Sequence, residues 1–201
     1  MSPTEAGDLL GVSRETLDRL EAYLELLERW QRRINLVGGG TLADPWRRHI
    51  VDCGQLWRHW LASPGRTVDL GSGAGLPGMI LAIMGAADLH LIESDQRKAA
   101  FLREAARVCG APATVHAERI EAVLPLAGDV ITSRALAPLT QLLAYAERHV
   151  HPGSTCLFLK GRNAMSELTE AARTWTMDAS WMASLSDPDG RVLILREIRR
   201  A

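Results

Sequence analysis

A glycine-rich stretch at residues 67–78, TVDLGSGAGLPG, constrains this chain more than any other feature. An apolar run ends at Gly71, Gly73 and Gly75, and a helical pattern follows from Met79. Glycine permits backbone angles that are closed to other residues and lets a ligand approach the main chain, while the helix offers unpaired N–H groups to the same place. The stretch therefore predicts a strand, a tight turn and a helix that form the floor of a nucleotide-type cofactor site.

The glycines alone do not choose the cofactor, because Gly73, Gly75 and Gly78 also satisfy the dinucleotide fingerprint GxGxxG. The next predicted strand, residues 89–92, ends in Glu93. A carboxylate at the end of that strand can accept hydrogen bonds from both hydroxyls of a ribose. Such a group suits S-adenosylmethionine and NAD alike. A surface turn in an ordinary α/β domain, without a ligand, is the alternative interpretation.

Length and composition favour one large α/β domain with an N-terminal appendage, since the chain has 201 residues and 47% hydrophobic content. Apolar runs are too short for a membrane span and no export signal opens the chain, so we expect a cytoplasmic protein without a membrane partner. Cys53, Cys109 and Cys156 are widely spaced and the histidines show no ligand spacing. We therefore expect neither disulfides nor a metal site.

The net charge of −1 hides an uneven distribution of basic side chains. Local patches, rather than the total charge, set the field that a polyanion feels. Such a patch indicates either a nucleic-acid contact or a solvated helix face paired with acidic residues such as Glu21, Glu25 and Glu28. The N-terminal basic cluster comprises Arg29, Arg32, Arg33, Arg47, Arg48, His49, Arg58 and His59.

The N-terminal part of the chain has helical periodicity. Apolar residues recur at helical spacing over residues 4–34, with Ser13 as an N-cap, and again over residues 42–60. A linker at residues 62–66 follows. The predicted organisation is an N-terminal helical extension, residues 1–62, and one compact second domain, residues 66–201.

Strands and helices alternate after the glycine turn, which implies a parallel sheet with right-handed crossovers and a ligand at the carboxyl ends of its strands. We expect Gly71, Glu93, Glu118 to Glu121, Arg134 and Lys160 to converge at that edge. The further predicted strands are residues 114–117, 129–132 and 154–159, and the predicted helices are residues 96–109, 120–124 and 138–146.

The C-terminal tail favours one cofactor over the other. A helix near residues 165–175 precedes two strand-like runs, residues 180–185 and 191–195, joined by a Pro-Asp-Gly turn. An antiparallel hairpin at the end of such a sheet is typical of S-adenosylmethionine-dependent methyltransferases. The predicted fold is therefore α/β, a Rossmann-like class I methyltransferase with a mostly parallel seven-stranded sheet that ends in an antiparallel hairpin, preceded by the N-terminal helical extension.

A series of short motifs carries a resemblance to a known family. They are NLV (35–37), RRHIVDC (47–53), VDLGSGAGLPG (68–78), IES (92–94), RIE (119–121), ITSRA (131–135) and LKG (159–161). Their order and spacing resemble the RsmG (GidB) family of bacterial 16S ribosomal RNA methyltransferases, from about Leu24 to Gly161. The resemblance implies transfer of a methyl group from S-adenosylmethionine to N7 of guanine 527, in the 530 loop of 16S ribosomal RNA.

The resemblance also implies roles for individual residues. RNA contacts are hypotheses for Asn35, Arg47, Arg48, His49 and Lys160, although Val37 is followed by three glycines where many family members have a basic residue. The implied cofactor site comprises Gly71, Leu76, Glu93, Ser94, Asp95, Ile120, Glu121 and Arg134, to which the glycine turn adds Gly73.

The residues after the fourth predicted strand bear on the chemistry. Many methyltransferases of exocyclic amines have N/D-P-P-Y there, whereas residues 133–136 are SRAL. That difference favours guanine N7, which attacks without first losing a proton, so no strong general base is required and no catalytic residue is assigned beyond the candidate Arg134. Arg134 either contacts the cofactor carboxylate or the RNA, or pairs with Glu118 or Glu121. Lys160 either contacts a phosphate or base edge, or is a solvated loop lysine.

Other functions remain open from the residues. They are an S-adenosylmethionine-dependent methyltransferase of another RNA or of a small molecule, an NAD-linked oxidoreductase, and a non-catalytic RNA-binding assembly factor. The expected partner is 16S ribosomal RNA or the small ribosomal subunit, and we expect a monomer.

Overall fold

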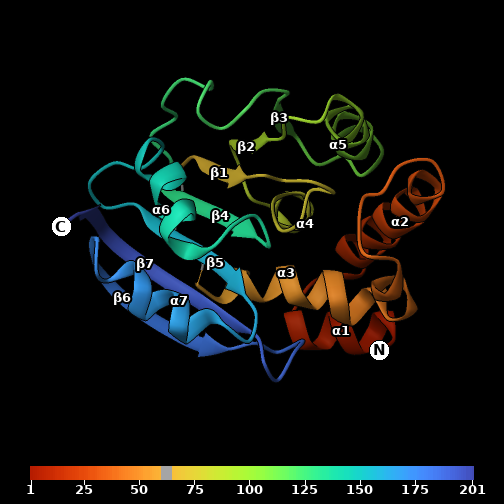
Figure 1. The fold of residues 1–201 in the computed structure, drawn as a ribbon. Helices are drawn as coiled ribbons and strands as arrows, with labels where there is room; N and C mark the ends of the chain where they lie inside the picture. Colours follow the sequence, from red (N-terminus) through yellow and green to blue (C-terminus); the bar gives the residue numbers. More distant parts are fainter. Residues whose placement is uncertain (60–64) are drawn as a thin grey trace.

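A seven-stranded sheet with helices on both faces forms the centre of the molecule, in a computed structural model that describes residues 1–59 and 65–201 (Figure 1). The strand order is β3-β2-β1-β4-β5-β7-β6, in which the first five strands are parallel and β7 alone runs antiparallel to both of its neighbours, β5 and β6. The predicted fold class is confirmed. The strands are β1 (Thr67–Leu70), β2 (Leu89–Ile92), β3 (Ala113–His116), β4 (Val130–Arg134), β5 (Thr155–Lys160), β6 (Trp175–Ala183) and β7 (Arg191–Arg200).

Alternation along the strands divides the core between the two faces of the sheet. In β1, Val68 and Leu70 point to one face, and Phe158 of β5 joins them. Leu157 and Leu159 point to the opposite face. Helices α6 (Leu139–Glu147) and α7 (Ala164–Ala171) cover the first face, and α4 (Gly78–Met84), α5 (Gln96–Val108) and the N-terminal helices cover the second (Figure 1).

The first two helices start with side-chain caps. Ser2 and Glu5 form a capping box before α1 (Pro3–Leu10), and Gly11 ends that helix with φ of +67°. Ser13 then accepts a hydrogen bond from the Thr16 N–H and starts α2 (Arg14–Gln31). The helical region predicted at residues 4–34 is therefore two helices.

The second helical region is a series of short pieces where the sequence predicted one helix over residues 42–60. A 3₁₀ helix and a π-helix precede two further short pieces, and the Asp52 N–H reaches the Arg47 carbonyl five residues back. Trp60 and residues 62–64 of the predicted linker lie outside the described residues. The pieces are η1 (Gly39–Ala43), η2 (Trp46–Val51), α3 (Asp52–Gly54) and η3 (Gln55–His59).

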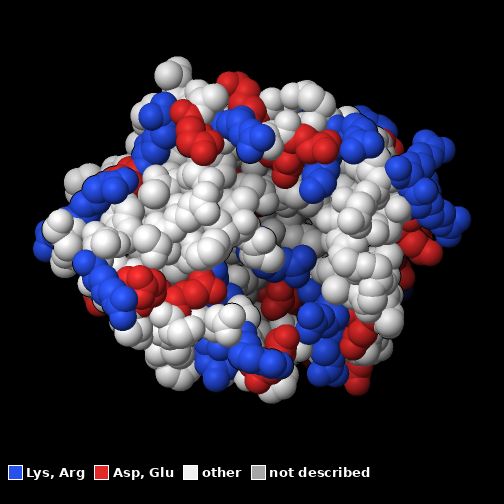
Figure 2. Space-filling view, viewed as in Figure 1, with Lys and Arg blue, Asp and Glu red and all other residues white. Residues whose placement is uncertain are grey.

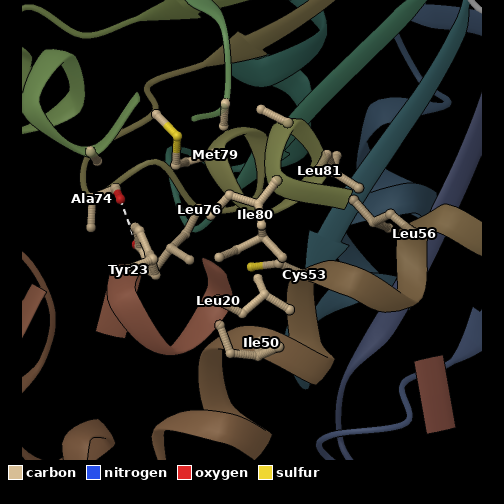
Figure 3. Close-up of a cluster of buried hydrophobic side chains, with 14 of the residues drawn as sticks. Leu20, Tyr23, Ile50, Cys53, Leu56, Ala74, Leu76, Met79, Ile80 and Leu81 are labelled. Atoms are coloured by element: carbon tan, nitrogen blue, oxygen red, sulfur yellow. Dashed lines mark hydrogen bonds between the residues drawn. The ribbon is translucent and has the colours of Figure 1, made fainter. Parts of the chain in front are cut away.

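The N-terminal helices pack directly against the glycine turn (Figure 3). The Tyr23 hydroxyl donates to the Ala74 carbonyl at 2.6 Å, and the Tyr23 side chain is fully buried. Leu20 and Cys53 of the extension lie against Ile80 of α4 in one apolar cluster. The N-terminal extension therefore packs against the glycine turn and helps to fix the position of the turn.

Several predicted elements differ from the structure, and both hairpin strands are longer than the predicted residues 180–185 and 191–195. Residues 120–124 form a turn, because Pro125 disfavours helical backbone at the residue before it. Helix α7 ends at Ala171, and Trp175 instead begins β6, where it is buried beneath the Arg200 guanidinium at 4.9 Å from the ring centre. The other predicted strands of the parallel sheet agree with the structure to within two residues. No helix in the described part of the chain is long and apolar enough to cross a membrane.

Candidate functional site

The turn after β1 adopts a conformation that glycine favours. Gly71 and Gly73 have φ of +65° and +57°, in the left-handed region. A Cβ on Gly71 would lie 2.5 Å from a methyl group of Leu136. The Ser72 N–H donates to the Ile92 carbonyl at 2.9 Å, which joins the turn to the end of β2. Main-chain atoms of the turn, without side chains over them, are therefore accessible to a ligand at the carboxyl ends of β1 and β2.

Glu93 reaches from the end of β2 to this turn. One carboxylate oxygen accepts from the Gly73 N–H at 2.8 Å, and the other accepts from the Asp95 N–H at 2.8 Å. A carboxylate has about four acceptor positions, so acceptor capacity remains for the hydroxyls of a ribose. The prediction that the glycine turn and the strand-end acid meet at one edge is confirmed.

A cavity of about 900 Å³ opens at this edge of the sheet, and Figure 2 shows a hollow with basic and acidic side chains along its margins. The expected convergence of strand ends is confirmed, because Glu118, Glu121 and Lys160 also line it. Asp95 does not line it and instead caps α5 by accepting from two backbone N–H groups. The predicted cofactor residues that line the cavity are Gly71, Gly73, Leu76, Glu93, Ser94, Ile120, Glu121 and Arg134.

Arg134 ends β4 and extends toward the N-terminal helices. It forms an ion pair with Asp52 at 2.9 Å, and both side chains are 19% exposed. Pairing with Glu118 or Glu121, the structural alternative from the sequence, is therefore wrong. Arg134 lines the cavity, so its remaining N–H groups are available to a ligand there.

His49 is buried, with 1% exposure, so the solvated helix face, one of the two interpretations of the basic cluster, is wrong for this residue. Its Nδ1 lies 3.3 Å from the Arg134 guanidinium, which can only donate, so Nδ1 accepts. The Nε2 atom lies 3.0 Å from the Thr41 hydroxyl, whose own proton goes to the Gly38 carbonyl. Burial, with the charges of Arg134 and Arg48, lowers the pKa of His49 to about 4. The imidazole is therefore neutral and carries its proton on Nε2.

The other predicted RNA contacts lie in different surroundings. Arg48 lines the cavity and pairs with Asp187 at 3.1 Å. Arg47 and Asn35 are exposed and lie outside the cavity lining. The Lys160 side chain is 8% exposed and pairs with Glu167 at 2.6 Å, so the solvated loop lysine of the sequence interpretation is wrong.

The loop between β6 and β7 reaches the cavity, which the sequence interpretation missed. Ser184, Asp187 and Arg191 all line the cavity, although the sequence assigned them only to a hairpin. Because β7 runs antiparallel to β5, the start of β7 lies beside the carboxyl end of β5, with Arg191 opposite Lys160. The predicted antiparallel hairpin was therefore the sequence signal for this contact, because it brings the loop before β7 to the carboxyl end of the parallel strands.

Asp69 lies buried beneath the glycine turn. One of its carboxylate oxygens accepts from the Thr132 hydroxyl at 2.8 Å, and the other has no hydrogen-bond partner among the residues that the structure describes. Burial raises the pKa of Asp69 to about 6. A Cβ on Gly78 would lie 2.8 Å from Asp69, so the first turn of α4 packs directly on this carboxyl.

The cavity fits S-adenosylmethionine. The glycine turn gives main-chain access, Glu93 has free acceptor capacity for a ribose, and Ile92 and Ile120 provide apolar surface. At the other end, Arg134 offers N–H groups that match a carboxylate. The groups present thus suit a nucleoside joined to a charged amino-acid end.

Comparison with known proteins finds relatives along the whole chain. The family described as "GidB: rRNA small subunit methyltransferase G" matches residues 16–195. A "Ribosomal RNA small subunit methyltransferase G" from Paramagnetospirillum magneticum is 56% identical over all of this chain and 98% of its own length. A relative of the same description from Rhodospirillum rubrum is 50% identical over the full length of both chains.

Solved structures agree on the fold. A SAM dependent methyltransferase from Aquifex aeolicus has a TM-score of 0.59 and 16% identity, covering 78% of this chain and 95% of its own. A ribosomal protein L11 methylase from Lactobacillus delbrueckii has a TM-score of 0.58 and 17% identity, covering 71% and 73%. These two similarities show the fold alone. The profile match and the full-length relatives show more: the chain belongs to the rRNA small subunit methyltransferase G family.

Proposed function

We propose that this protein transfers a methyl group from S-adenosylmethionine to N7 of a guanine in 16S ribosomal RNA. The observation that carries the proposal is the Gly73 N–H to Glu93 hydrogen bond inside the cavity, in a chain of this family. The implied target is guanine 527 in the 530 loop. Because the proposed substrate is ribosomal RNA, we propose that the protein acts in the cytoplasm, as a monomer, on the RNA or the small subunit.

The residues around the cavity have distinct roles in this proposal. Glu93 and the glycine turn hold the nucleoside part, and Arg134 holds the carboxylate of the amino-acid part. When bound, S-adenosylmethionine supplies an electrophilic methyl group on a positively charged sulfur. Guanine N7 has a lone pair and no proton, so the protein needs only to hold the base in line and to screen charge. His49 is a weak base, because its pKa is lowered and its Nδ1 lone pair already accepts from Arg134, and Arg134 stays charged, so neither group is suited to remove a proton.

RNA contacts in this proposal come from the basic side of the cavity. Arg48 and Lys160 line it, and Arg47 and Asn35 lie on the adjoining surface. Arg48 and Lys160 are paired with carboxylates in the free protein, so an RNA phosphate would have to compete with Asp187 and Glu167.

The direct test uses small subunits from a strain that lacks this methylation. Purified protein is incubated with tritiated S-adenosylmethionine and either naked 16S RNA or assembled subunits. Chain scission at 7-methylguanine then maps the modified nucleotide. We expect label in one guanine of the 530 loop, and the better of the two substrates identifies the natural one.

The same preparation separates the other functions. Label in another RNA position, or in no RNA while S-adenosylmethionine binds, would overturn the proposed substrate. Binding of NAD instead of S-adenosylmethionine would indicate an oxidoreductase. RNA binding without affinity for either cofactor would indicate an assembly factor.

A further inference from the structure

Asp52 joins the N-terminal extension to the candidate methyl-donor site. Its carboxylate pairs with Arg134, which lies 82 residues further along the chain, at 2.9 Å. Asp52 lies in α3, and Arg134 is the last residue of β4. Because both side chains are only 19% exposed, solvent screens this pair less than a surface pair.

The Arg134 guanidinium is only partly used by the protein. Its Nη1 donates to Asp52 and to the Arg48 carbonyl at 3.0 Å, and its Nη2 donates to His49 at 3.3 Å. A guanidinium has five N–H groups, so two remain without an acceptor among the described residues, on Nε and Nη2. Paired N–H groups of a guanidinium match the two oxygens of a carboxylate.

The Asp52 carboxylate is itself held by the loop between β6 and β7. Its second oxygen accepts from the Ser186 hydroxyl at 2.5 Å. The Gln55 amide donates to the Asp52 carbonyl at 2.8 Å and to the Ser184 hydroxyl at 3.1 Å. One oxygen of the Asp52 carboxylate is therefore held by the Ser186 hydroxyl of this loop and the other by Arg134, while Gln55 links the Asp52 main chain to the same loop.

We propose that Asp52 is a positioning residue for the methyl-donor site. By holding Nη1, the Asp52 carboxylate turns the free N–H pair of Arg134 into the cavity, where it binds the carboxylate of the amino-acid end of S-adenosylmethionine. The N-terminal extension is thus part of the cofactor site through Asp52. This inference rests on the proposed function only for the identity of the methyl donor.

A double-mutant cycle tests the proposal with S-adenosylmethionine as the titrant in calorimetry. We expect Asp52→Asn to weaken binding about tenfold, the size of one lost charge-assisted contact. Arg134→Ala should weaken binding at least as much. In the Arg134→Ala background, Asp52→Asn should cause no further loss, because Asp52 acts only through Arg134.

Asp44→Asn is the matched control, because Asp44 is a carboxylate of the same extension that pairs with Arg47 outside the cavity. Its affinity for S-adenosylmethionine should equal that of the wild type. Thermal unfolding of each variant shows that the measured protein is folded. Asp52→Glu keeps the charge and moves the carboxylate by one methylene, and it supplies a second cycle if Asp52→Asn does not fold.

Two outcomes would overturn the proposal. One is unchanged affinity in a folded Asp52 variant. The other is an equal loss in the wild-type and Arg134→Ala backgrounds, which would mean that Asp52 acts without Arg134. Because the readout is cofactor binding, an enzyme that binds S-adenosylmethionine but leaves 16S RNA unmodified would contradict the proposed function without touching this cycle.

Discussion

The two ends of the cavity are built in different ways. At one end, Gly71, Gly73 and Glu93 follow two neighbouring strands, and a main-chain N–H group is the donor in each hydrogen bond. At the other end, Asp52 and Arg134 come from distant parts of the chain, and side chains make the contacts. Main-chain contacts depend on backbone angles, whereas side-chain contacts depend on the packing of whole elements. Backbone strain should therefore have its largest effect at the first end, whereas the second end depends on individual side-chain charges alone.

The largest effect is expected from Gly71→Val, which tests the main-chain end. A β-branched side chain at φ of +65° and 2.5 Å from Leu136 has no room, so the turn must move. We expect affinity for S-adenosylmethionine to fall by about a hundredfold or more in calorimetry. Gly110→Ala is the control, because Gly110 has φ of +56° with open space around it and lies outside the cavity lining. Equal losses in the two variants would contradict a specific role of the turn.

This contrast also explains how much could be predicted from the sequence. The turn and Glu93 were predictable because glycine spacing and strand ends are local signals. The partner of Arg134 was not, because no local pattern relates Asp52 to a strand end 82 residues away. The burial of His49 was missed for a similar reason, since a π-helix shifts which side chains face the sheet. A site whose side chains come together only through tertiary packing is therefore not predictable from local sequence patterns.

The second prediction concerns pH, because a buried group with a shifted pKa lies near each end, Asp69 beneath the glycine turn and His49 beside Arg134. His49 has a folded pKa of about 4, below its ordinary value of about 6.5, so its contribution to stability is present above pH 6.5 and lost as the pH falls toward 4. Asp69 has a folded pKa of about 6, above its ordinary value, so its contribution is present near pH 4 and lost as the pH rises through 6. Each trend amounts to about 3 kcal/mol, and the two oppose each other between pH 4 and 6.

Urea unfolding between pH 4 and 7 separates these two contributions. Relative to the wild type, His49→Gln should gain unfolding free energy as the pH falls, because the variant has no imidazole to protonate. Asp69→Asn should gain relative to the wild type as the pH rises from 4 to 6, because it has no buried charge to form. Difference curves that stay flat with pH would contradict these assignments.

The third prediction separates the two ends by ligand. Glu93→Gln should weaken the binding of both S-adenosylmethionine and 5′-methylthioadenosine about thirtyfold, because both ligands have the ribose whose hydroxyls we propose as donors to the Glu93 carboxylate. Arg134→Ala should weaken only S-adenosylmethionine, since 5′-methylthioadenosine has no carboxylate. Calorimetry with both ligands checks this. A parallel loss of both ligands in Arg134→Ala would show that the ends are not independent.

The smallest effect is expected for RNA binding at the side-chain end. Arg48 lines the cavity but is paired with Asp187. An RNA phosphate must replace this carboxylate, so the net free energy of the new ion pair is small. Arg48→Ala should weaken 16S RNA binding about fivefold and lower the slope of log affinity against log salt by about 1. Asp187→Asn should have the opposite effect on affinity, because Arg48 is then free for the phosphate. Arg173→Ala is the control, because Arg173 follows α7 and is an exposed arginine paired with Glu170. This variant should leave the salt slope unchanged. If Arg48→Ala and Arg173→Ala behave alike, the RNA does not reach this end of the cavity, and its contact surface lies elsewhere on the molecule.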